Sequence, residues 1–309
     1  MNSYGDEFKQ VLTSAEAYNE LGWSKYEQQD YEGALKDLDK AIELDPNYAV
    51  AYSTRGIAKC EQHDYAGAIL DYDKALELDP AFVDAYCSRG LAKYYKQDYE
   101  GAILDYDKAI ELNPNYAEAY NNRGMAKYYQ KNYDEAIKDY DKAIELDLNS
   151  ANSYNYRGLA KYYKQDYEGA ILDYDKAIEL NPNYAEAYDN RGDAKYYKQD
   201  YTGSILDYDK AIELDPTFVE AYNSRGLTKG ELKDYTGATK DYDKVIELDP
   251  NFAMAYNIRG LIKFDKHDYA GAILDYDKAI QLSHNYADAY NNRAIAKSLQ
   301  KNYEEAIKD

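Results

Sequence analysis

Cysteine, histidine and proline are scarce in this sequence. Its 309 residues include 2 Cys, 3 His and 6 Pro. Two cysteines cannot build a disulfide framework, and His63, His267 and His284 lie too far apart to suggest a metal site. No glycine-rich phosphate-binding loop is present, because each Gly occupies a helix-packing or turn position of a repeated pattern. We therefore expect no metal, no cofactor and no catalytic site, and we predict that the chain is not an enzyme.

Positive charge and long apolar segments are also in short supply. The chain has 37 Lys and Arg against 58 Asp and Glu, which gives a formal net charge of -21. Such a surface would repel nucleic acid and anionic lipid alike. No segment approaches the roughly 18 consecutive apolar residues of a membrane span, and the first residues show no signal-peptide pattern. We expect no nucleic-acid partner, no membrane association and a cytoplasmic location.

Tyrosine, in contrast, is abundant and regularly spaced. Many of the 40 Tyr recur at intervals of 34 residues, which is the signature of an internal repeat. This interval separates Tyr18, Tyr52, Tyr86, Tyr120, Tyr154, Tyr188, Tyr222, Tyr256 and Tyr290. Counting from Ala15, we predict a 1–14 extension followed by a single domain, 15–309. Its repeats span 15–48, 49–82, 83–116, 117–150, 151–184, 185–218, 219–252 and 253–286, with a partial ninth at 287–309.

Each repeat is expected to form two helices. In the third repeat, Ala, Tyr and Gly residues at 85, 86, 90 and 92 lie on a first helix, and apolar residues at 102, 106, 109, 110 and 112 form a stripe on a second. Asp98 between them is a good N-cap, and Pro114 ends the second helix. The same cap position is Asp or Asn in every repeat: Asp30, Asp64, Asp98, Asn132, Asp166, Asp200, Asp234, Asp268 and Asn302.

These residues resemble the tetratricopeptide repeat. The resemblance is carried by Tyr86-x2-Arg89-Gly90-x2-Lys93, then Ala102-x3-Tyr106, then Pro114. It implies an all-α fold, a right-handed superhelical solenoid of antiparallel helix pairs whose first helices line a concave face. The fourth repeat departs from the pattern with Leu148 in place of Pro, so its turn should be looser or its second helix longer.

An arginine occupies the same first-helix position in every repeat except the first, which has Leu21. Because only the first repeat lacks a predecessor, we predict ion pairs between repeats, from Asp37–Arg55 through to Asp275–Arg293. Pairing within a repeat is the alternative, and it would leave Asp37 without its Arg. On the second helices we expect a recurring leucine to be partly buried against the next repeat, and the alternative is an apolar strip on the outside: Leu70, Leu104, Leu172, Leu206 and Leu274.

The resemblance places the candidate binding residues on the concave face. Asparagine amides there could grip an extended peptide backbone; they are Asn121, Asn122, Asn155, Asn190, Asn223, Asn257 and Asn291. Exposed tyrosines would add a contact surface: Tyr95, Tyr129, Tyr163 and Tyr197. The alternatives are a solvated polar face for the amides and packing between repeats for the rings.

These features predict a non-enzymatic scaffold that binds a protein or peptide in the concave groove. The groove lacks the Lys and Arg with which some family members clamp a C-terminal carboxylate, so a neutral or basic partner is expected. Two alternatives stay open. The chain could assemble head to tail into a homo-oligomer, or it could be the non-catalytic array of a larger enzyme.

Overall fold

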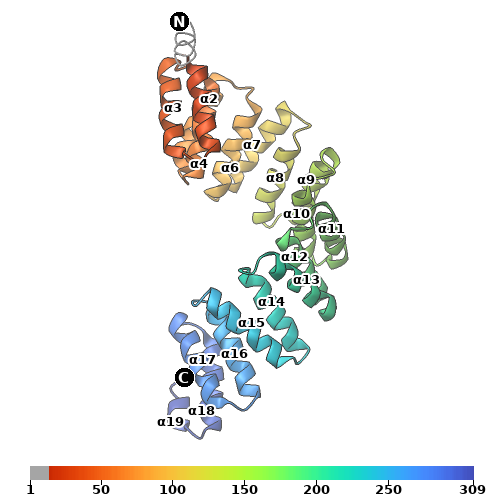
Figure 1. The fold of residues 1–309 in the computed structure, drawn as a ribbon. Coiled ribbons are helices and arrows are strands. Elements are labelled where there is room, and N and C mark those ends of the chain that lie inside the picture. The colour runs from red at the N-terminus through yellow and green to blue at the C-terminus, as the bar shows by residue number, and fades with distance from the viewer. Residues whose placement is uncertain (1–13) are drawn as a thin grey trace, which may run out of the picture. The chain divides into compact units, whose positions relative to one another are not determined.

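The computed structural model describes residues 14–309, so the predicted extension lies outside the described residues except for Ser14. Within that range there are 18 helices and no strands (Figure 1). The first helices of the repeats are α2 (Ala15–Glu27), α4 (Ala49–Glu61), α6 (Val83–Tyr95), α8 (Ala117–Tyr129), α10 (Ala151–Tyr163), α12 (Ala185–Tyr197), α14 (Val219–Glu231), α16 (Ala253–Asp265) and α18 (Ala287–Leu299). The second helices are α3 (Tyr31–Leu44), α5 (Tyr65–Leu78), α7 (Tyr99–Leu112), α9 (Tyr133–Leu146), α11 (Tyr167–Leu180), α13 (Tyr201–Leu214), α15 (Tyr235–Leu248), α17 (Tyr269–Leu282) and α19 (Tyr303–Ala306).

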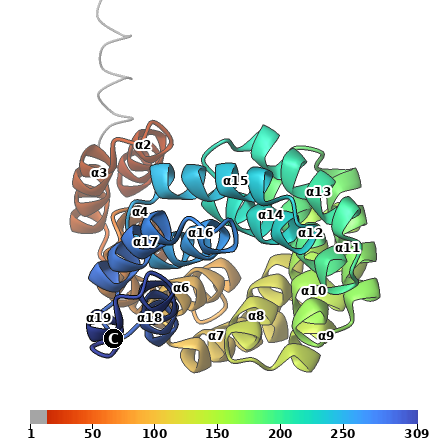
Figure 2. The same cartoon turned by 90° about the horizontal axis from the view of Figure 1, so that it is seen from below.

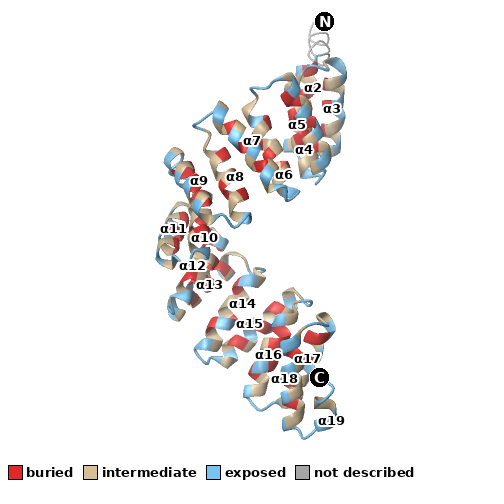
Figure 3. Cartoon of the chain, turned by 180° about the vertical axis from the view of Figure 1, so that it is seen from behind, coloured by how far each residue is buried: buried red, intermediate tan, exposed pale blue. Residues whose placement is uncertain are grey.

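The chain divides into two compact units, with the boundary after Ala160 inside α10. In each unit a first helix packs on the second helix of its own repeat, and that second helix packs on the first helix of the next repeat. In the second unit, for example, α12 to α15 follow one another side by side in both views (Figure 2). Buried residues lie along the helices where they face each other, and the turns are exposed (Figure 3). No helix within residues 14–309 combines the length and apolarity needed to cross a bilayer.

A repeated turn joins the two helices of a pair. In the third repeat Gln97 adopts a left-handed conformation with φ 63°, and the Asp98 N–H donates to the Lys93 carbonyl at 3.0 Å. This is the Schellman closure of a helix, although glycine is the residue that usually takes the left-handed position. Eight other turns use a non-glycine residue in the same way: Gln29, His63, Lys131, Gln165, Gln199, Lys233, His267 and Lys301.

The predicted N-caps form where the cap is aspartate. Asp98 accepts from the Gly101 N–H at 2.9 Å, and a Cβ at Gly101 would lie 2.2 Å from the Asp98 carboxylate. The cap therefore needs both the aspartate and the glycine. The prediction is wrong for the two asparagines, Asn132 and Asn302, which make no side-chain cap bond; the third residue after each is a glutamate.

Tyrosine, alanine and glycine build the core. The largest fully buried side chains are a tyrosine from the second helix of each repeat after the first: Tyr72, Tyr106, Tyr140, Tyr174, Tyr208, Tyr242 and Tyr276. The ring of Tyr106 rests directly on Gly90, where an added Cβ would lie 2.7 Å from Cε1. The glycine of the first helix is thus required by close approach of a ring.

The arginines pair within their own repeat, so the predicted Asp37–Arg55 register is wrong. Arg55 Nε and Nη2 donate to both oxygens of Asp71 at 2.9 and 2.5 Å, and Lys59 Nζ lies 2.7 Å from the same carboxylate. Contact with the preceding repeat does occur, but through Asp39, which accepts from Arg55 Nη1 at 2.7 Å. Asp37 instead faces its own first helix and lies 2.5 Å from Lys25 Nζ.

The same arrangement recurs along the chain. The bidentate within-repeat pairs are Arg89–Asp105, Arg123–Asp139, Arg191–Asp207, Arg225–Asp241, Arg259–Asp275 and Arg293–Asp309. Each carboxylate is buried, with side-chain exposure of 3–6%. The pairs to the preceding repeat use aspartates that are about half exposed, so they contribute less to stability than the buried ones.

Of the two outcomes predicted for the fourth repeat, the longer second helix does not occur, because α9 has 14 residues as its counterparts do. The looser turn agrees with the distance from the Ser150 N–H to the Asp147 carbonyl, which is 3.4 Å against 3.1 Å in the preceding repeat. The recurring leucines are not half-buried, since Leu70, Leu104, Leu172, Leu206 and Leu274 are 64–69% exposed. They lie on the outer side of the second helices.

Candidate functional site

The asparagines predicted to line the concave face differ in their exposure. Asn122, Asn155 and Asn257 are buried, whereas Asn121, Asn190 and Asn223 are half-buried and Asn291 is exposed. Amides of adjacent first helices bond to each other, as Asn292 Nδ2 does to Asn257 Oδ1 at 3.1 Å. Asn122 likewise points its Nδ2 at Cys87 Sγ, 3.7 Å away. Part of this amide row therefore joins neighbouring repeats.

The four tyrosines predicted as contacts are all on the surface. Tyr95, Tyr129, Tyr163 and Tyr197 are 52–55% exposed. Three of them stack flat on a tyrosine that begins a second helix, with interplanar angles of 11–17° in the pairs Tyr65–Tyr95, Tyr99–Tyr129 and Tyr167–Tyr197. The stacking holds each ring in one orientation while about half of its surface stays exposed, which suits a preorganised contact surface.

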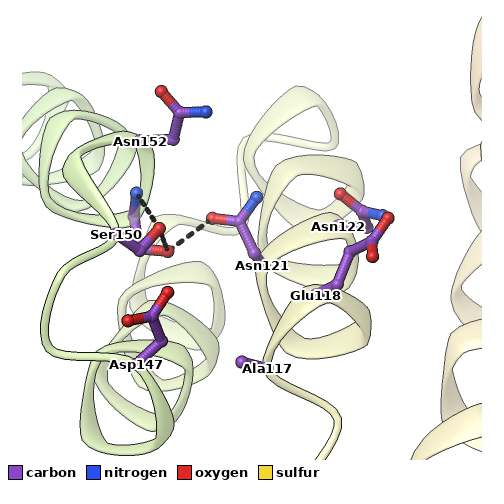
Figure 4. Close-up of a pocket in the computed structure, with 8 residues that line it drawn as sticks. Ala117, Glu118, Asn121, Asn122, Asp147, Ser150 and Asn152 are labelled. Atoms are coloured by element: carbon purple, nitrogen blue, oxygen red, sulfur yellow. Dashed lines mark hydrogen bonds between the residues drawn. The ribbon is translucent and has the colours of Figure 1, made fainter.

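A polar hollow of about 360 Å³ lies between α8 and α10, in the first unit (Figure 4). Its lining includes Asn121 and Asn122 of the predicted set, together with residues that the sequence analysis did not single out: Ala117, Glu118, Asp147, Ser150, Asn152 and Ser153. Ser153 Oγ donates to Asn121 Oδ1 at 3.0 Å and lies 2.8 Å from Ser150 Oγ. This chain of bonds fixes the Asn121 amide with its oxygen toward α10.

The second unit contains a pair of carboxylates, one buried and one half-buried, that the sequence analysis also missed. Asp189 and Asp193 are four residues apart on one face of α12. Asp189 is 7% exposed, and its Oδ1 has no hydrogen-bond partner; the Tyr208 hydroxyl donates to Asp193 at 2.7 Å. Burial, and next the neighbouring charge of Asp193, raise the pKa of Asp189 to about 8. The pKa of Asp193 is raised by burial as well.

The sequence did carry a signal for this pair. Asp193 stands where the other repeats have an apolar residue: Trp23, Ile57, Leu91, Met125, Leu159, Leu227, Leu261 and Ile295. A charged residue where every other repeat has a partly exposed apolar residue is an exception that only comparison of all the repeats reveals.

Groups that could carry chemistry are not assembled. Among residues 14–309 no cluster of three or more His, Cys, Asp or Glu could hold a metal ion. Both cysteines are free thiols. Burial raises the pKa of the Cys87 thiol to about 12 and also raises that of Cys60, so neither is a ready nucleophile.

Sequence profiles of the tetratricopeptide repeat match most of the chain. One profile matches residues 15–48, 117–150 and 219–252. The second matches residues 56–97, 90–131, 158–197, 192–233 and 260–300. The chain belongs to the tetratricopeptide repeat family. Members of this family are generally non-catalytic scaffolds for protein–protein interaction, and the all-α solenoid predicted from the sequence is confirmed. No curated protein sequence matches the chain.

Solved structures share the fold at low sequence identity. A chain of the APC/C hetero-tetramer Cut9–Hcn1 superposes with a TM-score of 0.65 at 17% identity over 86% of this chain; the match spans about half of that chain, 52%. A tetratricopeptide repeat protein from Parabacteroides merdae gives 0.64 at 20% identity, covering 80% of this chain and 98% of its own. PilF of Pseudomonas aeruginosa gives 0.59 at 22% identity, covering 65% and 92%.

Proposed function

We propose that this tetratricopeptide array is a non-catalytic scaffold that binds an extended segment of a partner protein on the face formed by its first helices. The observation that carries the proposal is the hollow between α8 and α10, which is partly open to solvent. Within the first unit it places polar side chains from two successive repeats around one space.

The hollow offers groups that suit a peptide backbone. The Asn121 oxygen is engaged by Ser153, which directs the Nδ2 donor of the same amide to the open side. Glu118 and Asp147 add acceptors. An extended chain presents N–H and C=O groups in alternation, so donors and acceptors side by side can bind it without reading its side chains. These carboxylates and the net charge of -21 favour a neutral or basic partner.

Selection from a displayed library of random peptides tests this proposal directly. The selected peptides would be measured by calorimetry against the wild type, Asn121→Ala, Tyr129→Ala and Leu104→Ser. We expect roughly 5- to 10-fold weaker binding for Asn121→Ala, because one hydrogen bond is lost, and a similar loss for Tyr129→Ala. Leu104 lies on the outer side and is 68% exposed, so its variant should bind as the wild type does. If Leu104→Ser weakens binding and the other two do not, the assigned face is wrong.

A further inference from the structure

The last position of each repeat carries an aromatic ring with a single exception. The residues at this position are Tyr48, Phe82, Tyr116, Ser150, Tyr184, Phe218, Phe252 and Tyr286. Ser150 alone has no ring, and it lines the hollow between α8 and α10.

The neighbouring repeat shows where that ring normally lies. Tyr116 packs against the core cluster that contains Cys87, and the two side chains influence each other electrostatically. At the other end of the chain, Tyr286 and Asn257 are likewise close enough for the amide to affect the pKa of the phenol. In both cases the ring lies near the fifth residue of its own repeat, on the first helix.

The residues one repeat after those near Tyr116 line the hollow. The residues 34 positions after Cys87 and Asp84 are Asn121 and Glu118, and both line it. The hollow is therefore the space that an aromatic side chain at position 150 would occupy. Its volume of about 360 Å³ exceeds the roughly 150 Å³ of an engineered cavity that binds benzene.

We propose that this hollow binds a tyrosine side chain supplied by the partner segment, which takes the place of the ring that the repeat lacks. This inference rests on the proposed function, because it assumes that the partner lies on the first-helix face. The ring would fill a site whose shape the repeat already creates for a phenol or phenyl group.

The walls of the hollow favour a phenol over a phenyl group. Glu118 can accept from the hydroxyl, much as it does from Tyr116 on its other side, at 3.4 Å. The Asn121 Nδ2 can donate to the phenol oxygen. Ser153 replaces an alanine that is buried in every other full repeat after the first, and its hydroxyl holds Asn121 in place. A phenyl ring would leave these polar groups without a partner.

Ser150→Tyr gives a decisive test, because it fills the hollow with the tyrosine that other repeats carry at the same position. The full chain would be titrated with N-acetyl-tyrosinamide, N-acetyl-phenylalaninamide and N-acetyl-leucinamide, and NMR would follow the side-chain amides of Asn121 and Asn122. We expect the tyrosine amide to bind the wild type at millimolar concentration, several-fold more tightly than the phenylalanine amide, and the leucine amide not to bind. Leu104→Ser, on the outer side and away from the hollow, should bind the tyrosine amide within about threefold of wild type.

Ser150→Tyr should bind the tyrosine amide at least 10-fold more weakly and melt no lower than the wild type. Equal binding of the tyrosine amide by Ser150→Tyr and wild type would overturn the inference. So would equal binding of the leucine and tyrosine amides by the wild type.

The peptide selection separates this inference from the proposed function. Enrichment of Tyr among selected peptides, with binding that Ser150→Tyr weakens, supports both. Peptides that depend on Asn121 but not on a tyrosine, and that bind Ser150→Tyr normally, leave the function standing and reject the inference. Tyrosine-amide binding without any selected peptide supports the hollow and rejects the function. A mass that falls to monomer in Ser150→Tyr would show that the ring comes from a second copy, which also rejects a partner segment.

Discussion

The carboxylate pair on α12 should make the stability of its repeat depend on pH. Two substitutions remove the pair while restoring residues that the array uses elsewhere: Asp189→Asn, as at Asn223 and Asn257, and Asp193→Leu, as at Leu227. Both replacements fit the existing packing, so the double variant isolates the ionisable groups. We expect it to be more stable than the wild type at neutral pH and to lose less stability as pH rises.

The raised pKa of Asp189 fixes the direction and the size of this pH dependence. Asp189 titrates at about 8 in the folded chain against a usual value of 3.8, so folding retains a proton that the unfolded chain releases. Its stabilising contribution is complete below about pH 4 and is lost as pH rises toward 8, by about 1.4 kcal/mol per pH unit. Between pH 5 and pH 7 the wild type should therefore lose about 3 kcal/mol that the double variant keeps.

Hydrogen exchange of the α12 amides measures this loss repeat by repeat. A local measurement is needed because a solenoid can open one repeat at a time. Protection factors, which correct for the intrinsic pH dependence of exchange, would be converted to opening free energies at pH 5, 6, 7 and 8 for both proteins. The α6 amides, in the other unit, serve as an internal reference. If the α12 free energies of the two proteins run parallel across this range, the pair is not desolvated as described.

Three other predictions concern stability and use thermal or urea unfolding. Gly90→Ala should destabilise the chain by about 2 kcal/mol, because the new Cβ would lie 2.7 Å from a tyrosine ring. Gly230→Ala, where a Cβ would have nothing within 4 Å, should stabilise it by about 1 kcal/mol. Equal effects of the two substitutions would contradict the packing described for Gly90. Asp105→Ala should cost about 3 kcal/mol because it removes the buried carboxylate that Arg89 and Lys93 share. Asp107→Ala, at a half-exposed aspartate, should cost less than about 1 kcal/mol; the reverse order would show that the exposed pairs dominate. Gln97→Gly should stabilise by about 1 kcal/mol because it relieves a left-handed φ of 63°, and an unchanged midpoint would show that the turn is unstrained.

The 34-residue period predicted the helices well because all the repeats share one pattern of apolar, cap and turn residues. The Asp cap and the Gly packing position were both visible as recurring letters, and helix ends followed from them. The sequence does not indicate whether Asp37 or Asp39 contacts the next repeat. The two lie two residues apart on the same helix, so only the rotation of that helix against its neighbours decides.

The site was harder to predict, because sites lie where a repeat departs from its own pattern. The asparagine row was chosen from its recurrence, yet recurrence also marks residues that join neighbouring repeats, such as Asn257 and Asn292. Ser150 and Asp193 occur once each and were hidden by averaging over repeats. An exception is informative only when the environment of its counterparts is known, and that requires coordinates.

The charge pairing described for Arg55 bears on how such an array grows. The buried carboxylate in each such pair is neutralised by an arginine and a lysine encoded within the same 34 residues, as Asp71 is by Arg55 and Lys59. Gain or loss of one such unit during gene duplication therefore leaves none of these carboxylates without its partners, and only a solvated contact such as that with Asp39 must form again. Copy number can consequently change at little thermodynamic penalty.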